Sequence, residues 1–408
     1  MNHKTSRDLS LWQYRSFMWF WYARIASGFG FQMLSVAVGW QIYAMTGRAF
    51  DLGLIGLAQF LPSLLLALPA GHVADQFQRR QIIIVTRSFE LLAILALAVG
   101  SWFHLLNEML ILGLIMWVGI FKAFEFPAMA SIVPGLVPEK VLPRALAMNN
   151  SASELASIIG PAIGGFLYLA GPGAVYTTTA VLYLIAVVLM TRIHLAKPKA
   201  KREPATLKTL FAGIHFIRVR PVILGIISLD LFAVLLGGAT ALLPIFARDI
   251  LHTGPWGLGL LRAAPAVGAL LMSFWLARHV IQRHVGMIMF ASVAGFGIAT
   301  IIFAFSNLLW LSLFALAFLG AFDMVSMVIR SALIQLETPD DMRGRVSAVN
   351  SIFINTSNQL GEFESGVLAS LFGAVSAAAI GGIGTLVVVA LWMGLFPQLR
   401  QRQRLDKN

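Results

Sequence analysis

The chain contains no cysteine, and only 12% of its 408 residues are charged. Without cysteine, neither a disulfide framework nor a thiolate metal site is possible. A soluble domain is about a quarter charged, whereas 58% of these residues are apolar and the mean hydropathy is +0.81. The composition therefore predicts an integral membrane protein.

Other absences exclude several classes of function. No phosphate-binding G-x-x-x-x-G-K-[ST] motif is present, so we do not expect ATP to be the direct energy source. The histidines have no convincing metal-ligand spacing, and no nucleophile is accompanied by a catalytic base or metal set. We therefore expect a protein that is not an enzyme and uses no cofactor and no metal.

Long, continuous apolar runs predict membrane-spanning helices. A helix needs roughly 20 apolar residues to span a bilayer, and backbone groups in lipid must bond within their own segment. The expected fold is an all-α integral membrane protein with twelve transmembrane helices and no inserted soluble domain. The twelve spans are 17–45, 52–72, 81–103, 109–132, 145–169, 174–193, 221–250, 256–277, 285–305, 308–331, 346–371 and 374–396.

One long, basic connection divides the spans into two sets of six. The second part of this connection has the spacing of an amphipathic helix, with apolar positions at Leu207, Leu210, Phe211, Ile214 and Ile217. We expect this helix to lie on the membrane surface. The predicted organisation is an N-terminal six-helix bundle (1–193), a cytoplasmic linker with the amphipathic helix (194–220), a C-terminal six-helix bundle (221–397) and a cytoplasmic tail (398–408).

Lysine and arginine residues predict the orientation, because they concentrate in cytoplasmic loops. With both termini in the cytoplasm, and with Arg192 and Arg248 at span ends assigned to the adjoining loops, 23 of the 30 lie in cytoplasmic segments and five lie within the spans. The opposite side keeps only Arg48 and Arg248. The positive charges on the cytoplasmic side suit contact with anionic lipid. They lack the aromatic side chains that stack on bases in a nucleic-acid site, so we expect no nucleic-acid partner.

The two halves are related in sequence. A fixed offset of 201 pairs Gly119 with Gly320, Pro138 with Pro339, Arg144 with Arg345, Asn149 with Asn350 and Gly160 with Gly361. A weaker offset of 206 pairs residues 52–54 with 258–260. Paired halves of this kind bind substrate between them and expose it to the two sides alternately. The repeat therefore favours a carrier over a channel.

The loop after the second span reads G-x-x-x-D-x-x-x-R-R, with Gly71, Asp75, Arg79 and Arg80 at the defined positions. Glycine lets two helix ends approach closely. The carboxylate and the two guanidinium groups can form a cytoplasmic latch that opens and closes as helices move. In this motif the chain resembles the major facilitator superfamily, and the resemblance implies two pseudo-symmetric six-helix bundles.

A second motif is Gly160-Pro161-Ala162-Ile163-Gly164-Gly165 in the fifth span. It is similar to a superfamily motif associated with proton-coupled antiport. Small residues also allow close helix packing, and proline favours a kink. A role in antiport and a role in packing alone are both open at this point.

Within the superfamily the chain resembles the drug and siderophore exporters. The resemblance is carried by residues 23–27, 36–38 and 53–54, and by Gly344-Arg345-Val346 with Asn350. It implies a secondary transporter of the bacterial inner membrane that exports a small organic molecule in exchange for protons. We expect a monomer whose partners are the substrate, protons and the lipid bilayer.

Charges within spans are the best site candidates, because a charge inside a membrane is costly unless it is paired or hydrated. The resemblance implies that spans one, four, seven and ten line the central cavity. The candidates for the cavity and for proton coupling are Arg24, Lys122, Glu125, Glu154, Asp230, Asp323 and Arg330. Under the two offsets, Arg24 corresponds to Asp230 and Lys122 to Asp323, so we expect opposite charges to face one another.

A structural role for these charges is the alternative. Lys122 with Glu125, and Arg87 with Glu90, have the i,i+3 spacing at which side chains on one helix neutralise each other. Asp230 has no basic residue within a helical turn, so it is the first candidate for proton carriage, followed by Glu125 and Asp323. A site that binds either proton or substrate couples their movements.

Two other functions share features with this prediction. An importer or a facilitator would have the same fold and differ in the direction or the driving force of transport. A lipid-moving protein or a membrane enzyme would need a lateral opening or a catalytic cluster, and we identify no catalytic cluster in the sequence.

Overall fold

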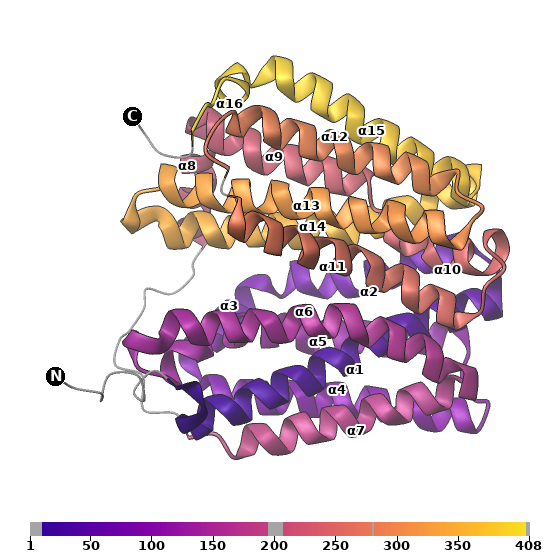
Figure 1. Cartoon of the computed structure of the whole chain (residues 1–408). Coiled ribbons are helices and arrows are strands. Elements are labelled where there is room, and N and C mark those ends of the chain that lie inside the picture. The colour runs from indigo at the N-terminus through magenta and orange to yellow at the C-terminus, as the bar shows by residue number, and fades with distance from the viewer. Residues whose placement is uncertain (1–9, 195–206, 280, 405–408) are drawn as a thin grey trace. The chain divides into compact units, whose positions relative to one another are not determined.

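A computed structural model describes residues 10–194, 207–279 and 281–404, and in these ranges the regular structure is helical, without strands (Figure 1). The helices are α1 Arg15–Thr46, α2 Ala49–Leu65, α3 Ala67–Gln76, α4 Arg79–Trp102, α5 Glu108–Ile132, α6 Leu142–Leu167, α7 Pro172–Thr191, α8 Leu207–Val219, α9 Pro221–Leu236, α10 Leu243–Ile245, α11 Pro255–Arg278, α12 Val285–Ala304, α13 Leu309–Glu337, α14 Asp340–Phe372, α15 Ala374–Leu395 and α16 Pro397–Arg400. A π-helix, η7, covers Phe246–Ile250.

Each of the twelve predicted spans coincides with a helix or a group of consecutive helices. Among the described residues, ten helices are long and apolar enough to cross a membrane, and the number is eleven if α2 and α3 form one bent span. The remaining predicted span corresponds to α14, which has 33 residues but carries many serine, asparagine and glutamate side chains. The all-α membrane fold is confirmed, and the predicted count of twelve is consistent with these helices.

Two predicted spans are interrupted. In the second span, α2 contains Pro62 and ends at Leu65, and the chain bends by 59° before α3 continues. Proline removes a backbone donor from a helix, which favours such a break. In the seventh span, α9 ends before Gly237 and Gly238, and short helices including η7 complete the segment. Neither irregularity was anticipated from the sequence, and residues 221–250 still form one segment long and apolar enough to cross a membrane.

The chain divides into two compact units, which do not coincide with the predicted halves. Unit 1 comprises Met1–Gln41 and Leu61–Ala205, and unit 2 comprises Ile42–Phe60 and Thr206–Asn408. The first half of α2 belongs to unit 2 because it packs closely on α14. A Cβ atom placed on Gly53 would lie 3.2 Å from Cα of Gly366, and the rings of Phe50 and Phe363 meet edge to face at 6.2 Å.

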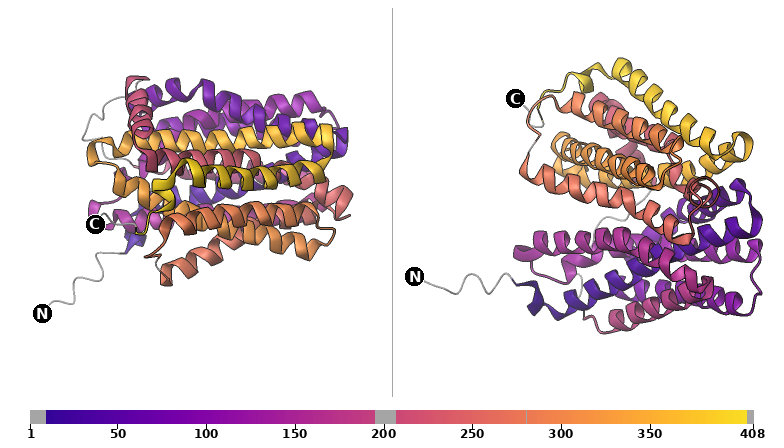
Figure 2. Two further views of the ribbon diagram at one scale, coloured as in Figure 1. Left: turned by 90° about the horizontal axis from the view of Figure 1, so that it is seen from above. Right: turned by 45° about the vertical axis from the view of Figure 1, so that its right-hand side comes forward.

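Within each unit, long helices pack side by side along their length. In unit 1, α4 packs against α5 and α7, and in unit 2, α13 packs against α11 and α12 (Figures 1 and 2). Glycine permits a close approach in unit 2, where a Cβ atom on Gly320 would collide with the backbone of Pro265. This register fixes which side chains of α11 and α13 lie at the same level.

The helix α8 lies within the predicted linker. The side chains of 207–211 are outside the described residues, so half of its predicted apolar face is not described. Ile217 is buried in a cluster with Ile223, Ile334 and Val346, whereas Ile214 is exposed. Of the described apolar positions, Ile217 therefore packs within unit 2, whereas Ile214 faces outward.

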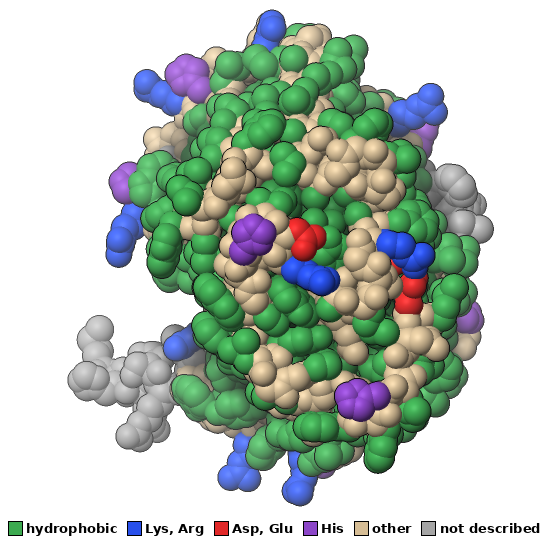
Figure 3. Space-filling view, turned by 90° about the vertical axis from the view of Figure 1, so that its right-hand side faces the viewer, with side chains coloured by type: hydrophobic (Ala, Val, Ile, Leu, Met, Phe, Trp, Pro, Cys, Tyr) green, Lys and Arg blue, Asp and Glu red, His purple; other side chains and the backbone are tan. Residues whose placement is uncertain are grey.

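Large hydrophobic side chains are abundant on the surface of the molecule. Examples are Phe103, Met109, Trp310 and Phe314, each exposed over more than half of its area. Figure 3 shows hydrophobic side chains across much of one face, among which charged side chains are few. A surface of this kind suits contact with lipid, because water would disfavour so large an apolar area.

Candidate functional site

A buried ion pair lies at the centre of the charged residues of unit 1. Nε of Arg87 on α4 donates to Oε1 of Glu125 on α5 at 2.7 Å. Arg87 is 1% exposed and Glu125 8%, so the pair is held away from solvent. A second nitrogen of Arg87 lies 3.7 Å from the sulfur of Met129.

Three further charged side chains surround this pair. Glu90 on α4 is fully buried and interacts electrostatically with Glu125, Lys122 and Arg87, with the hydroxyl of Tyr183 beside it. Lys122 on α5 places Nζ 2.8 Å from the ring centroid of Phe31, a cation–π contact. The structure therefore brings Lys122 and Glu125 together with Arg87 and Glu90.

Arg24 links this cluster to α6. Its guanidinium group donates to Oγ of Ser153 at 3.0 Å and interacts electrostatically with Glu125 and Arg87. The cluster thus contains three cationic side chains and two carboxylates from α1, α4 and α5. We name Arg24, Arg87, Glu90, Lys122 and Glu125 the N-terminal charge cluster.

The i,i+3 pairing considered from the sequence was wrong for Arg87. Its carboxylate partner is Glu125 on the neighbouring helix, not Glu90 on its own helix. Two facing helices of a bundle can bring side chains as close as one turn of a single helix does. Glu154, by contrast, is exposed on α6 and is not among the electrostatic neighbours of this cluster.

A second buried ion pair lies in unit 2, between Asp230 on α9 and Arg330 on α13. Asp230 is 6% exposed and Arg330 4%. Asp230 has no basic residue within a helical turn, as the sequence shows, but its partner comes from another helix. Arg330 is 100 positions away and reaches Asp230 across the packed helices.

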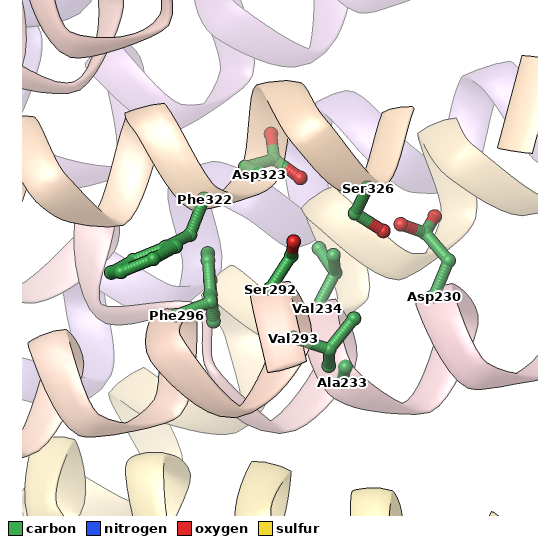
Figure 4. A pocket seen from close by; sticks show the side chains of 9 residues that line it. All are labelled: Asp230, Ala233, Val234, Ser292, Val293, Phe296, Phe322, Asp323 and Ser326. Carbon is green, nitrogen blue, oxygen red and sulfur yellow. The ribbon is translucent and has the colours of Figure 1, made fainter. Parts of the chain in front are cut away.

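Asp323 lies on the same helix as Arg330 and lines a small cavity. In this cavity, the volume open to the centre of a water molecule is about 10 Å³. Figure 4 shows its lining, which consists of Asp230, Ala233, Val234, Ser292, Val293, Phe296, Phe322, Asp323 and Ser326. Among the described residues, no ion-pair partner lies near Asp323. Asp323 is therefore held less tightly than Asp230 and takes its place as the first candidate for proton carriage in this unit.

The loop motif adopts an arrangement in which the predicted latch partners are apart. Gly71 and Asp75 lie in α3, and α4 begins at Arg79. Arg79 donates to the carbonyl of Ser131 at 2.7 Å, and Arg80 donates to those of Met190 and Thr191. The arginines thus bind carbonyl groups at the ends of α5 and α7, as cations stabilise helix C-termini.

Asp75 itself is exposed, and none of its contacts with described residues is an ion pair. In this structure the motif therefore ties together helices of unit 1 through Arg79 and Arg80 and leaves its carboxylate accessible. The latch that would involve Asp75 stays a prediction.

The glycine motif of the fifth span is a packing surface for α1. A Cβ atom on Gly164 would lie 2.9 Å from Cα of Met33, and one on Gly160 would lie 2.7 Å from Cβ of Gln32. Gly165 is buried on the same helix, and Pro161 lies inside it. Nearby, Gln32 donates to Oγ of Ser157 at 3.0 Å. These contacts give the motif a definite structural role in holding α1 to α6.

Two contributors to the two sites were not singled out from the sequence. Tyr183 lies beside Glu90 of the N-terminal charge cluster, and Ser326 lies in the cavity wall of unit 2. Arg87 and Glu90 were considered only as a structural pair. The spacing of Asp323, Ser326 and Arg330, at i, i+3 and i+7, places them on one helix face and could have identified Ser326. No local signal identifies Tyr183.

Solved structures with the same fold support the architecture. A bacterial homologue of the human lysosomal transporter Spinster, in an inward-facing and unoccupied conformation, is 14% identical with a TM-score of 0.72, over 95% of this chain and 96% of that one. A bacterial homologue of the iron transporter ferroportin is 16% identical with a TM-score of 0.70, over 96% and 100% of the two chains.

Curated relatives extend the comparison to sequence. The enterobactin exporter EntS of Citrobacter koseri is 26% identical over 384 residues, 93% of this chain and 91% of the relative. EntS of Salmonella choleraesuis is 26% identical over 386 residues, 93% and 92% of the two chains. The family model described as a transmembrane secretion effector matches residues 8–408. This chain therefore belongs to the transmembrane secretion effector family, within the major facilitator superfamily of transporters.

Proposed function

We propose that the protein is a secondary active transporter that exports a small organic molecule, siderophore or drug-like, from the cytoplasm in exchange for protons. One observation carries this proposal: each of the two units contains its own buried arginine–carboxylate pair. These are Arg87 with Glu125 in unit 1 and Arg330 with Asp230 in unit 2.

Such pairs link proton binding to a change in charge inside the membrane. An ionised pair in a low-dielectric interior is stable only while both partners are present. A proton on the carboxylate removes its negative charge and leaves the arginine without compensation. The freed guanidinium can then attract a substrate group or favour another helix arrangement, and loss of the proton restores the pair.

Export from the cytoplasm is the direction that the named relatives suggest, since they are enterobactin exporters. The distribution of lysine and arginine supports an inner-membrane protein with both termini in the cytoplasm. In this orientation, protons returning to the cytoplasm would drive the substrate outward. The N-terminal charge cluster, with three cations and two carboxylates, would accommodate a polar or anionic part of the substrate.

The test is transport by the purified protein in proteoliposomes with an imposed pH gradient. A panel of enterobactin and other siderophores, dyes and cationic drugs serves as candidate substrates. We expect a substrate to accumulate on the acidic side and the accumulation to stop when a protonophore removes the gradient. Equilibration that is independent of the gradient would instead indicate a facilitator, and accumulation on the alkaline side would indicate a proton-coupled importer.

A further inference from the structure

A short polar track runs along one face of α13. Asp323, Ser326 and Arg330 are separated by three and four residues, which keeps them within a stripe about 60° wide on an α-helix. Arg330 pairs with Asp230 at one end of the stripe. Asp323 occupies the other end, and Figure 4 shows Ser326 between the two carboxylates.

Asp323 and Asp230 line the same cavity, but among the described residues no hydrogen bond joins their carboxyl groups, and Arg330 holds Asp230. Direct transfer requires heavy atoms about 2.6–3.2 Å apart. An intervening group that both accepts and donates a proton is therefore required.

Ser326 has the properties of such a group. Its side chain is 3% exposed, and its Oγ has no hydrogen-bond partner among the described residues. Two other buried serines of unit 2 bond to their own helix: Ser292 donates to the carbonyl of Ile288 at 2.7 Å and Ser357 to that of Ile354 at 3.0 Å. A helical serine ordinarily has this option, so the free hydroxyl of Ser326 in a cavity wall is unusual.

The cavity beside Ser326 completes the track. It is lined by both carboxylates and by Ser292 and Ser326. The volume open to the centre of a water molecule is about 10 Å³, close to the lower limit of about 10–15 Å³ for one ordered water. The polar walls give that water hydrogen-bond partners.

We infer that Ser326, with one water molecule in this cavity, relays a proton between Asp323 and Asp230 and so controls the ion pair of Asp230 with Arg330. This inference rests on the proposed proton-coupled transport and assigns its path within unit 2.

Each step of the relay transfers one proton, and no atom is oxidised or reduced. Protonated Asp323 gives its proton to the water, and the water gives one of its own protons to Oγ of Ser326. Ser326 in turn gives its hydroxyl proton to a carboxylate oxygen of Asp230. Asp323 ends as a carboxylate and Asp230 as a carboxylic acid, while Ser326 and the water are regenerated. The neutral Asp230 no longer compensates Arg330.

Other charged groups near the track come from α11 and α14. α9, α12 and α15 carry no charged side chain except Asp230. On α11, Arg262 interacts electrostatically with Glu362 on α14. Glu364 is the other acid in the middle of α14.

The experiment compares Ser326→Ala, which lacks the hydroxyl, with Ser326→Thr, which keeps it. Both are measured in proteoliposomes by two assays: substrate accumulation driven by a pH gradient, and substrate counterflow at equal pH. We expect Ser326→Ala to slow the driven accumulation at least tenfold and to change counterflow less than twofold. Ser326→Thr restores most of the driven rate, and the wild-type driven rate falls in D₂O more than that of Ser326→Ala.

Ser357→Ala is the matched control, because it removes another buried serine hydroxyl of unit 2 outside the cavity. We expect both assays to stay at the wild-type level. Equal driven rates for Ser326→Ala and wild type would overturn the relay, as would failure of Ser326→Thr to restore the rate. A wild-type protein that transports substrate without responding to the pH gradient would instead overturn the proposed function on which the relay rests.

Discussion

Arg87 on α4 and Glu125 on α5 form an ion pair of 2.7 Å between two helices, with both side chains buried. The pair belongs to α4 and α5, which pack along their length. Replacing one partner leaves a charge in an apolar interior, which costs more than the pair contributes while it is intact. This relationship makes the N-terminal charge cluster testable through stability as well as transport.

Glu125→Gln is expected to lower the free energy of unfolding by about 3–5 kcal/mol, because it leaves the buried guanidinium of Arg87 without its ion-pair partner. Thermal unfolding of the detergent-solubilised protein measures the effect. The double variant Arg87→Met with Glu125→Leu should recover much of the loss, since an apolar pair avoids the unpaired charge. Glu154→Gln is the control, and a loss as large as that of Glu125→Gln would contradict the assignment of the pair.

Substitutions in the loop motif should separate stability from turnover. Arg80→Ala removes the hydrogen bonds to the carbonyls of Met190 and Thr191 and should lower stability by about 1 kcal/mol. Asp75→Asn changes an exposed side chain and should alter stability by less than about 0.5 kcal/mol. Asp75→Asn should nevertheless slow transport while substrate affinity is retained. An equal loss of binding would argue against a latch.

Gly164→Ala tests the contact between α6 and α1. The added Cβ would lie 2.9 Å from Cα of Met33, and because that neighbour is backbone, we expect destabilisation of about 1–3 kcal/mol. Gly113→Ala is the matched control, since a Cβ there meets nothing within 4 Å and alanine favours the helix by about 0.5–1 kcal/mol. Similar unfolding temperatures for the two variants would exclude tight packing at Gly164.

Asp230→Asn and Asp323→Asn should differ in their effect on stability and have the same effect on pH-driven transport. Asp230→Asn removes the partner of Arg330, so it should cost about 3–5 kcal/mol. Asp323→Asn breaks no ion pair, and we expect a cost below about 1 kcal/mol. Both variants should lose accumulation driven by a pH gradient. If either variant kept the full driven rate, its carboxylate would not carry the proton.

Hydrophobicity was sufficient to predict the helices. Each predicted span coincides with helical structure, since lipid-spanning segments must be long, apolar and internally hydrogen-bonded. The polar helix α14 was among the predicted spans, although it is not among the helices that are apolar enough by hydropathy to cross a membrane. The breaks near Leu66 and Gly237 were not predicted, because proline and glycine also occur in continuous membrane helices.

The pairing of charges could not be read from local sequence. Rules for neighbours on one helix suggested Glu90 for Arg87 and no partner for Asp230, whereas the partners are Glu125 and Arg330. Those choices depend on which helices pack together and in which register. The internal repeat identified the helices that carry the charges, but not the rotation of each helix about its axis.

The most direct test of proton coupling measures proton movement itself. Proteoliposomes that contain a pH-sensitive dye in the lumen are prepared without a pH gradient, and a transported substrate is added outside. Exchange predicts that the lumen becomes more alkaline as substrate enters, and that Asp323→Asn abolishes this change while counterflow continues. Substrate entry without any change of luminal pH in the wild type, under conditions that allow charge compensation, would contradict the account.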